Sequence, residues 1–391
     1  MPSKNSMKIG IDLLWVRVGI CGGTESFIRN LLYALSIYDK ENEYMLFCAD
    51  DNEKTFRHYH DQNSRFHIVK CPVKSMDRVK RIAWENLHLD DAAKKVGVDI
   101  MYVPVYSMPR RKKKNGISYI TTIHDLQGMH YPEYFSKPRL LFLKRSWRYS
   151  VRNSRAVIAI SGFTKKDILE HFPEAEGRVY VIPNTVVYEP SVNPLSDLEK
   201  YGIKKDEYFY CVSSLLPHKN LNTILETFGL RKRGEKLVIS GVGGSREQKE
   251  ALHERVKSLG IEKDVIYTGF VSDSERNLLY ENCKLFLFPS VYEGFGMPPV
   301  EALMAGKFVV TTEAASIPEA TCGQAFYVHD AYDPKEWSRV IDTAIERVEV
   351  ITCEEGRARG SLIKKQFEKY SPENVAKAYL EMFERVKNSN G

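Results

Sequence analysis

The stretch Leu285-Phe-Leu-Phe288, followed by Pro289-Ser-Val-Tyr-Glu-Gly-Phe-Gly-Met-Pro-Pro-Val-Glu301, decides the fold and points to the site. Its four apolar residues predict a buried strand, and the glycines after them predict a tight turn. We expect a helix to begin near Pro298, because proline is tolerated in the first turn of a helix. Strand, turn and helix in this order predict a βα unit whose turn lies at the carboxyl end of a strand, where such sheets bind ligands.

The turn between this strand and helix has the chemistry of an anion site. Gly294, Phe295 and Gly296 lie directly before the predicted helix. Backbone N–H groups there point toward an anion, and glycine lets the backbone approach a phosphate closely. Glu293 and Glu301 flank the turn, and their carboxylates can accept hydrogen bonds from sugar hydroxyl groups. Two glutamates at this spacing are common by chance, so the interpretation depends on the whole string.

Short apolar runs alternate with amphipathic stretches along all 391 residues, which predicts parallel βαβ units with helices on both faces of each sheet. A proline-containing stretch over 181–194 interrupts the alternation and predicts a linker. The chain is therefore expected to form two doubly wound, Rossmann-like domains that face each other across a cleft. Strands are expected at Lys8–Leu13, Tyr44–Cys48, Phe66–Val69, Ile100–Val103, Tyr119–Ile123, Ala156–Ile160, Tyr208–Ser213, Lys236–Ser240, Val265–Thr268, Leu285–Phe288, Phe308–Thr311 and Ala325–Val328.

Composition excludes several classes of protein. A net charge of +6 is only mildly basic, so it does not by itself indicate a nucleic-acid partner and fits an anionic ligand or an acidic membrane surface. The seven cysteines are widely spaced with no Cys-x-x-Cys pair, which indicates neither a disulfide framework nor a zinc site and favours a reducing cytoplasm. We expect no signal peptide, and no apolar run is long enough to span a membrane.

Several further motifs accompany the opening stretch, and their order along the chain is similar to that of a known family. They are Gly22-Gly-Thr24, Ile123-His-Asp-Leu126, Ser161-Gly-Phe-Thr-Lys-Lys-Asp167, Val181-Ile-Pro-Asn184, Val212-Ser-Ser-Leu-Leu-Pro-His-Lys-Asn-Leu221, Thr268-Gly-Phe-Val271 and Ser316-Ile-Pro-Glu319. Together with Glu293–Glu301, they resemble the retaining glycosyltransferases of family 4, which have the GT-B fold. The resemblance covers residues 8–330 and implies that 1–188 bind the acceptor and 189–370 the nucleotide sugar. It also implies that 371–391 form a helix that crosses back to the first domain.

The resemblance implies roles for individual residues. Lys219 would contact the donor diphosphate and stabilise the leaving group, Glu293 would bind the donor sugar, and His124 would contact the sugar or the acceptor. These three are the predicted catalytic residues. The predicted donor-binding residues are Gly22, Gly23, His218, Lys219, Val271, Glu293, Gly294, Phe295, Gly296, Met297 and Glu301. Among them, Glu301 is expected on the ribose.

One position departs from the family. An arginine is common there on the strand before Lys219, whereas this chain has Ser213 and Ser214. His218 could compensate in part, and the N–H groups of the Gly294–Gly296 turn would hold more of the diphosphate charge. No Asp-x-Asp occurs in the sequence, which agrees with a reaction that needs no metal and no cofactor.

Each of these residues also has a structural interpretation. Lys219 could be solvated, Glu293 could be a loop carboxylate, and Glu301 could be favoured only by the helix dipole. His124 could be a structural histidine at a strand end, and Asp125 could orient its imidazole or cap a turn. Gly22-Gly23 could form a plain turn.

The predicted activity is retaining transfer of a sugar from a nucleotide sugar to a glycan or lipid-linked glycan in surface polysaccharide synthesis. The short Leu215–Asn220 loop favours GDP-mannose, with UDP-sugars close behind. The alternatives are an inactive GT-B binding or scaffold protein and a GT-B epimerase or phosphorylase. Basic segments at 110–114 and 137–152 could contact an anionic membrane, or 137–152 could be a core helix with a solvated basic face. We therefore expect the protein in the cytoplasm or at the inner face of the cell membrane.

Overall fold

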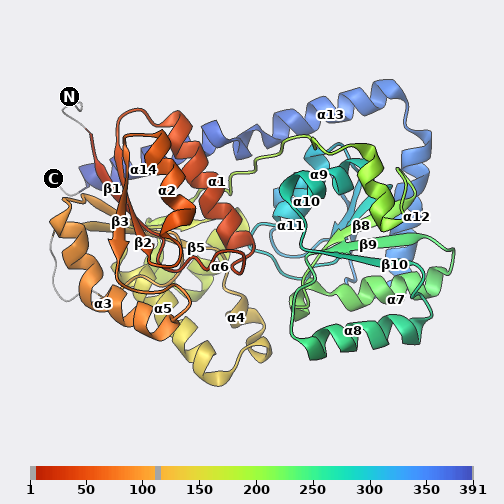
Figure 1. Cartoon of the computed structure of the whole chain (residues 1–391), viewed down its shortest axis with the longest axis horizontal. Helices are drawn as coiled ribbons and strands as arrows, with labels where there is room; N and C mark the ends of the chain where they lie inside the picture. Colours follow the sequence, from red (N-terminus) through yellow and green to blue (C-terminus); the bar gives the residue numbers. More distant parts are fainter. Residues whose placement is uncertain (1–5, 111–115, 390–391) are drawn as a thin grey trace. The chain divides into compact units, whose positions relative to one another are not determined.

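A computed structural model describes residues 6–110 and 116–389, and the chain divides into two compact units (Figure 1). The first consists of Met1–Thr185 with Lys369–Gly391, and the second of Val186–Glu368. The boundary after Thr185 lies inside the proline-containing stretch 181–194. Each unit has its own parallel sheet with helices on both faces, which confirms the predicted fold class.

The sheet of the first unit has the strand order β3-β2-β1-β4-β5-β6-β7 in the described part of the chain, and every pair is parallel. The order changes direction between β1 and β4, so the loops after these two strands meet at a topological switch point. The strands are β1 Lys8–Asp12, β2 Glu43–Ala49, β3 Phe66–Cys71, β4 Ile100–Val103, β5 Ser118–Ile123, β6 Ala156–Ala159 and β7 Val179–Val181.

The helices of the first unit follow its strands, except for one that comes from the end of the chain. They are α1 Gly23–Tyr38, α2 Glu53–Gln62, α3 Arg78–Lys95, α4 Gln127–His130, α5 Lys137–Asn153, α6 Gly162–His171 and α14 Pro372–Asn388. Helix α14 begins where the Ser371 side chain accepts a hydrogen bond from the Asn374 N–H. Its buried residues, which include Tyr379 and Phe383, recur at helical spacing and pack against α1 and β4.

The sheet of the second unit has the order β10-β9-β8-β11-β12-β13, again with only parallel pairs among the described residues. Its switch point lies between β8 and β11. The strands are β8 Tyr208–Val212, β9 Lys236–Ser240, β10 Val265–Gly269, β11 Leu285–Phe288, β12 Val309–Thr312 and β13 Phe326–Val328. The helices are α7 Leu221–Arg231, α8 Arg246–Leu259, α9 Asp273–Asn282, α10 Met297–Met304, α11 Ile317–Ala320, α12 Pro334–Val350 and α13 Cys353–Phe367.

All twelve predicted strands are confirmed to within two residues, and the helix expected near Pro298 begins at Met297. Helices α2, α4, α6 and α11 and strand β7 were not predicted, and α4 and α11 have only four residues each. Helix α2 buries only Glu53, Phe56 and Tyr59, and α6 buries mainly polar residues, so neither shows a clear apolar stripe. Strand β7 is three residues long, which is too short for a periodic signal.

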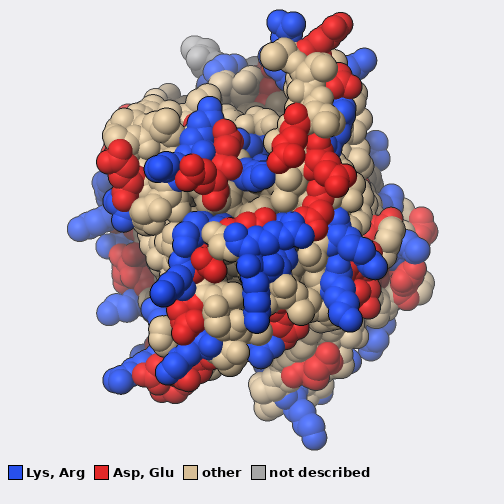
Figure 2. All heavy atoms as spheres, turned by 90° about the vertical axis from the view of Figure 1, so that its right-hand side faces the viewer, with Lys and Arg blue, Asp and Glu red and all other residues tan. Residues whose placement is uncertain are grey.

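Charged side chains on the described surface are largely mixed in sign. Figure 2 shows basic and acidic residues interspersed on one face of the molecule. Arg233 illustrates the pairing, since its exposed guanidinium lies 2.7 Å from Asp342. No helix in residues 6–110 or 116–389 is long and apolar enough to cross a bilayer.

The packing of α14 predicts that the last helix is needed for the stability of the first unit. Phe383 is fully buried, and its ring centroid lies 6.3 Å from that of Tyr102 on β4. Phe383→Ala should lower the free energy of unfolding by about 3–5 kcal/mol, because it leaves a cavity under the helix. Urea unfolding measures this change. Glu384→Ala, at the neighbouring exposed position, is the control, and an equal effect of both variants would contradict the packing.

Candidate functional site

The loops after β8 and β11 bring two charged side chains together at the switch point of the second sheet. Lys219 ends the short helical turn Pro217–Lys219, and Glu293 lies in the glycine-rich turn after β11. Lys219 Nζ lies 2.5 Å from Glu293 Oε1 and 5.5 Å from the ring centroid of Phe288. Only 21% of the lysine side chain and 15% of the glutamate side chain are exposed. A cation and a carboxylate are therefore held in contact where α/β sheets bind their ligands.

Hydrogen bonds tie the loops that bear these residues to each other. The backbone carbonyl of His218 accepts bonds from the Val291 N–H at 2.8 Å and the Ser290 hydroxyl at 3.0 Å. The Ser316 hydroxyl, from the loop after β12, donates to the Glu293 carbonyl at 2.8 Å. Three strand ends thus fix the position of the Lys219–Glu293 pair.

His218 is a neutral imidazole at physiological pH. Burial and, second, the nearby Lys219 charge lower its pKa to about 4, and Glu293 opposes both only in part. The side chain can therefore offer a hydrogen bond to a ligand at neutral pH, but not a positive charge.

The Gly294–Met297 turn has the backbone geometry expected of an anion site. Gly296 has φ +93°, which a residue with a side chain rarely adopts, and it is the N-cap of α10. Helix α10 starts at Met297 with proline in its first turn. The first N–H groups of a helix have no partner within it, so they and the helix dipole favour an anion here.

Two residues that the sequence analysis missed hold Glu301. The carboxylate is buried, accepts a hydrogen bond from the Tyr280 hydroxyl at 3.1 Å and lies 3.6 Å from Arg276 Nε. Burial lowers the pKa of Arg276, but the negative charge of Glu301, together with Tyr280 and Asp273, outweighs burial and raises the pKa. Both partners come from α9, and their i, i+4 spacing was the available signal that they share one helix face.

The serines at the position of the family's arginine lie beside β9. The Ser213 N–H donates to the Ser240 carbonyl at 3.0 Å, and the Ser213 hydroxyl donates to the Ser214 carbonyl at 3.2 Å. The Ser214 hydroxyl is buried and has no hydrogen-bond partner among the described residues. An unpaired buried hydroxyl at this sheet edge is a group that a ligand could satisfy.

The loops after β9 and β10 complete the same edge of the second sheet. Gly241 has φ +81°, and a Cβ there would meet the Ser213 carbonyl at 3.1 Å, so glycine permits the close approach of the two loops. The Gly241 N–H donates to the Gly269 carbonyl at 2.8 Å. Val271 is half-buried in the short loop between β10 and α9.

In the first unit, Gly22 and Gly23 begin α1 in the loop that follows β1. Gly22 has φ +56° and is the N-cap, and a Cβ at either glycine would meet nothing within 4 Å. Glu25, which the sequence analysis did not single out, accepts from the Gly19 N–H at 2.8 Å and from Arg29 at 2.7 Å. The buried Glu25 carboxylate therefore shapes this open glycine turn.

His124 is half-buried at the end of β5, and its ring packs edge-on against Phe27 with the centroids 4.8 Å apart. Its Nε2 lies 2.9 Å from the Pro104 carbonyl, which can only accept, so the neutral ring has its proton on Nε2 and its lone pair on Nδ1. Burial lowers the pKa to about 4, and the bond to Pro104 offsets only part of this shift. Asp125 Oδ1 accepts from the Gln127 N–H at 3.0 Å, which is a turn-capping contact.

The predicted residues therefore fall into two groups. Lys219, Glu293 and the turn before α10 form one cluster at the edge of the second sheet. His124, Gly22 and Gly23 lie in loops of the first unit. The roles of all of them in catalysis and donor binding stay predictions.

Two family profiles together match most of the chain. The profile described as Glycosyltransferase Family 4 matches residues 21–189, and the one described as Glycosyl transferases group 1 matches residues 196–354. Their boundary falls next to the division between the two units.

Curated relatives include two bacterial mannosyltransferases. The O-antigen chain mannosyltransferase B of Escherichia coli is 27% identical over 242 residues, which are 60% of this chain and 62% of that protein. The O-antigen chain mannosyltransferase RfbU of Salmonella typhimurium is 27% identical over 220 residues, 56% of this chain and 59% of that protein. This chain thus spans about three fifths of the length of these relatives.

Solved structures share the fold over nearly the whole chain. The structure of Anabaena HepE in complex with UDP and glucose has a TM-score of 0.70 at 18% identity, covering 97% of this chain and 100% of that one. A glycosyltransferase from Rickettsia africae has a TM-score of 0.71 at 15% identity, covering 98% and 99%. These likenesses show the GT-B fold.

The neutral state of His124 predicts a pH-dependent stability. The pKa is about 4 in the folded chain and 6.5 in the unfolded chain, so between these values only the unfolded chain takes up the proton. The contribution of neutral His124 to the free energy of unfolding is complete above pH 6.5. It is lost as the pH falls toward 4, by up to about 3 kcal/mol. Urea unfolding between pH 7 and pH 4 should show a shallower decline for His124→Gln than for the wild type. His253→Gln, at an exposed position on α8, should keep the wild-type slope; equal slopes in all three proteins would refute the assignment.

Proposed function

Because this chain belongs to the glycosyltransferases of the family 4 type, with the GT-B fold, we propose that it transfers a sugar from a nucleotide sugar to a glycan or lipid-linked glycan in surface polysaccharide synthesis. The observation that best supports the proposal is the Lys219–Glu293 contact of 2.5 Å at the switch point, directly before the N-terminus of α10. A cation and a helix N-terminus suit a diphosphate, and the carboxylate suits sugar hydroxyl groups.

The proposed chemistry is retaining and occurs on one face of the donor sugar. The bond from C1 of the sugar to the diphosphate oxygen breaks, and a bond from C1 to the acceptor oxygen forms on the same face. The acceptor hydroxyl proton passes to the departing phosphate oxygen, so no side chain acts as nucleophile. Lys219 and the N–H groups at the start of α10 stabilise the negative charge that grows on the leaving group.

Glu293 and His124 have distinct parts in this scheme. The lysine ammonium has three protons, so it can keep one bond to Glu293 while donating others to phosphate. Glu293 accepts from hydroxyl groups of the donor sugar and holds it in place. His124, with its lone pair on Nδ1, accepts from a hydroxyl of the sugar or acceptor.

Because the family's arginine is missing, fewer groups are available to stabilise the negative charge of the diphosphate. His218 is neutral at physiological pH, so it can add a hydrogen bond but no second cation. The buried Ser214 hydroxyl and the backbone of the Gly294–Met297 turn are the other donors at this edge. We therefore assign most of the charge stabilisation to Lys219 and the α10 N-terminus, with no metal ion in the transfer step.

GDP-mannose is the proposed donor. The short loop from Leu215 to Asn220 and the relatives named as mannosyltransferases support it. Because the similar Anabaena structure contains UDP and glucose, UDP-sugars are the second candidate donors. A panel of nucleotide sugars in a thermal-shift assay ranks them directly, since a ligand that binds only the folded state raises Tm.

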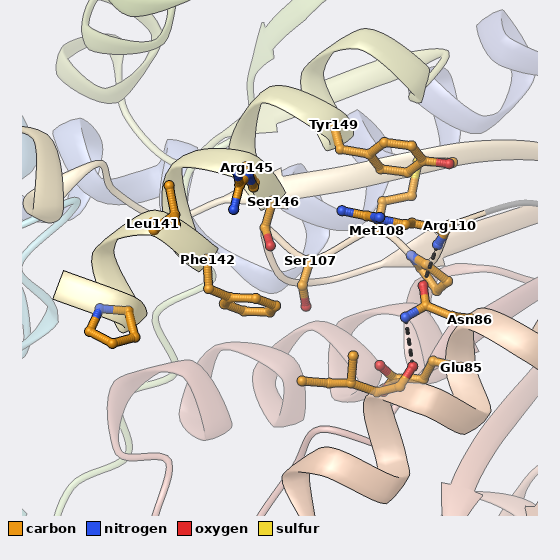
Figure 3. Close-up of a pocket in the computed structure, with 13 residues that line it drawn as sticks. Glu85, Asn86, Ser107, Met108, Arg110, Leu141, Phe142, Arg145, Ser146 and Tyr149 are labelled. Carbon is orange, nitrogen blue, oxygen red and sulfur yellow. Dashed lines mark hydrogen bonds between the residues drawn. The ribbon is translucent and has the colours of Figure 1, made fainter. Parts of the chain in front are cut away.

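A pocket of the first unit supports the proposed contact with a lipid-linked acceptor or a membrane surface. It has a volume of about 320 Å³ and lies between α3, α5 and the segment 107–110. Figure 3 shows Phe142 and Arg145 reaching in from α5, Glu85 and Asn86 from α3, and Arg110 from the loop. Residues 111–114 of the predicted basic run lie outside the described residues.

The chemistry of this pocket suits an anionic amphiphile. Within the described residues, no carboxylate lies within 4.0 Å of Arg110 or Arg145, and Phe142 is exposed. Burial and Asp12 raise the pKa of Glu85 to about 8, and Arg81 pairs with it at 2.6 Å, so the pocket has little negative charge. Helix α5 also buries Leu143 and Trp147, so it is a core helix whose basic face is available for lipid headgroups.

The proposed transfer reaction predicts that replacement of Lys219 strongly lowers kcat. Lys219→Ala should lower kcat by about 10²–10³ with GDP-mannose and a lipid-linked acceptor, because one stabilising contact to the developing charge is lost. Lys284→Ala is the matched control, since Lys284 directly precedes β11 at the opposite edge of the same sheet. Release of GDP together with a new α-mannoside, unaffected by chelator, identifies a retaining transferase that needs no metal. Phosphorolysis, epimerisation or binding without turnover would each reject the proposal.

The contact with lipid predicts binding to anionic vesicles. Arg145→Glu should weaken co-sedimentation with phosphatidylglycerol vesicles at least about fivefold, because a basic residue near such a surface contributes about 1 kcal/mol. Arg246→Glu makes the same charge change on α8 of the second unit and should not weaken binding. If both variants lose binding equally, the effect comes from net charge and not from this pocket.

A further inference from the structure

A cluster of two histidines and one aspartate lies in the first unit, apart from the residues proposed for transfer. His130 ends α4, and Asp167 and His171 lie one turn apart on α6. One potential ligand atom from each of the three side chains lies within 4.8 Å of the other two. Asp167 is only 3% exposed at the base of the cluster, whereas His130 and His171 are 36% and 30% exposed.

We propose that His130, Asp167 and His171 bind one divalent transition-metal ion, with Zn²⁺ the preferred ion, and that this ion joins α4 to α6. The inference does not depend on the transferase activity. It also assigns the ion no part in the transfer step, where the proposed chemistry uses no metal.

The distances support a shared ion. His130 Nε2 lies 2.7 Å from Asp167 Oδ1, and His171 Nδ1 lies 3.1 Å from the same oxygen. With bonds of about 2.0–2.2 Å to nitrogen and oxygen, two ligands of a tetrahedral ion lie about 3.4 Å apart. Each aspartate–histidine distance therefore has to lengthen by less than about 1 Å to admit an ion. The fourth position would face solvent and take a water molecule.

The donor set selects the kind of ion. Two imidazole nitrogens and one carboxylate oxygen suit Zn²⁺, Co²⁺ or Ni²⁺. Mg²⁺ and Ca²⁺ prefer oxygen ligands, so they should not compete. The competing arrangement is a metal-free cluster in which the imidazoles only donate to Asp167, and His171 Nδ1 also lies 3.0 Å from the Asp167 backbone carbonyl. Metal binding would replace that backbone contact.

The position of the cluster suggests what the ion stabilises. Helix α4 follows β5 after His124 and Asp125, and the Thr164 hydroxyl in the first turn of α6 donates to the His124 carbonyl at 3.3 Å. An ion between α4 and α6 would thus close a second link between the same two segments. Its binding free energy would add to the stability of the folded unit.

The test is a Co²⁺ titration of the full chain after removal of metals with a chelator. We expect one Co²⁺ per chain with the intense visible bands of a tetrahedral site, displacement by Zn²⁺ and no response to Mg²⁺. His130→Asn and His171→Asn should each weaken binding at least about tenfold, because even the loss of an outer hydrogen-bond partner of a metal ligand costs 10–100-fold. Zn²⁺ should raise Tm of the wild type and of neither variant.

His67→Asn provides the control for adventitious binding. The rings of His60 and His67 lie 6.2 Å apart, but among the described residues this pair is not part of a three-ligand cluster. The variant should bind as the wild type does. The proposal is overturned if the wild type binds no stoichiometric Co²⁺, if both cluster variants bind normally, or if His67→Asn loses as much. Charge-transfer bands from thiolate would also overturn it, since they would place the ion on cysteine. The stoichiometry and the visible spectrum of the wild type test the proposed metal site even if a variant folds poorly.

Discussion

The contact between Lys219 and Glu293 is the interaction on which the rest of the proposed site depends. The two opposite charges lie 2.5 Å apart and are largely removed from water. The free energy of desolvating them offsets much of their Coulomb attraction. Replacement of such a pair by apolar residues is often neutral for stability, so stability alone does not explain it. A diphosphate and a sugar would give each partner a second use: the ammonium can donate to phosphate while the carboxylate accepts from hydroxyl groups.

The parallel sheet makes this contact possible. The chain reverses its strand order between β8 and β11, so two loops separated by some seventy residues leave neighbouring strand ends on the same edge. Bonds from Ser290, Val291 and Ser316 then hold the loops in one arrangement. Such fixed donors need no rearrangement as charge develops, which is the physical basis of electrostatic stabilisation.

Burial also sets the protonation of the histidines. His124 and His218 both have a pKa of about 4, so both are neutral hydrogen-bonding groups at physiological pH. This changes the interpretation of the Ser213–Ser214 departure, since a neutral His218 cannot replace the charge of an arginine. The site consequently concentrates positive charge on Lys219 and the N-terminus of α10.

The sequence by itself determined the two doubly wound units, the strands other than β7 and the glycine turn before α10, because alternating apolar runs and glycine-proline spacing are local signals. It also placed Lys219 and Glu293 at strand ends. It could not determine the partners of Glu301, the burial of His124 or the meeting of His130 with Asp167 and His171. Those depend on which helix faces turn toward each other and on how much water packing excludes, and only the tertiary structure decides both.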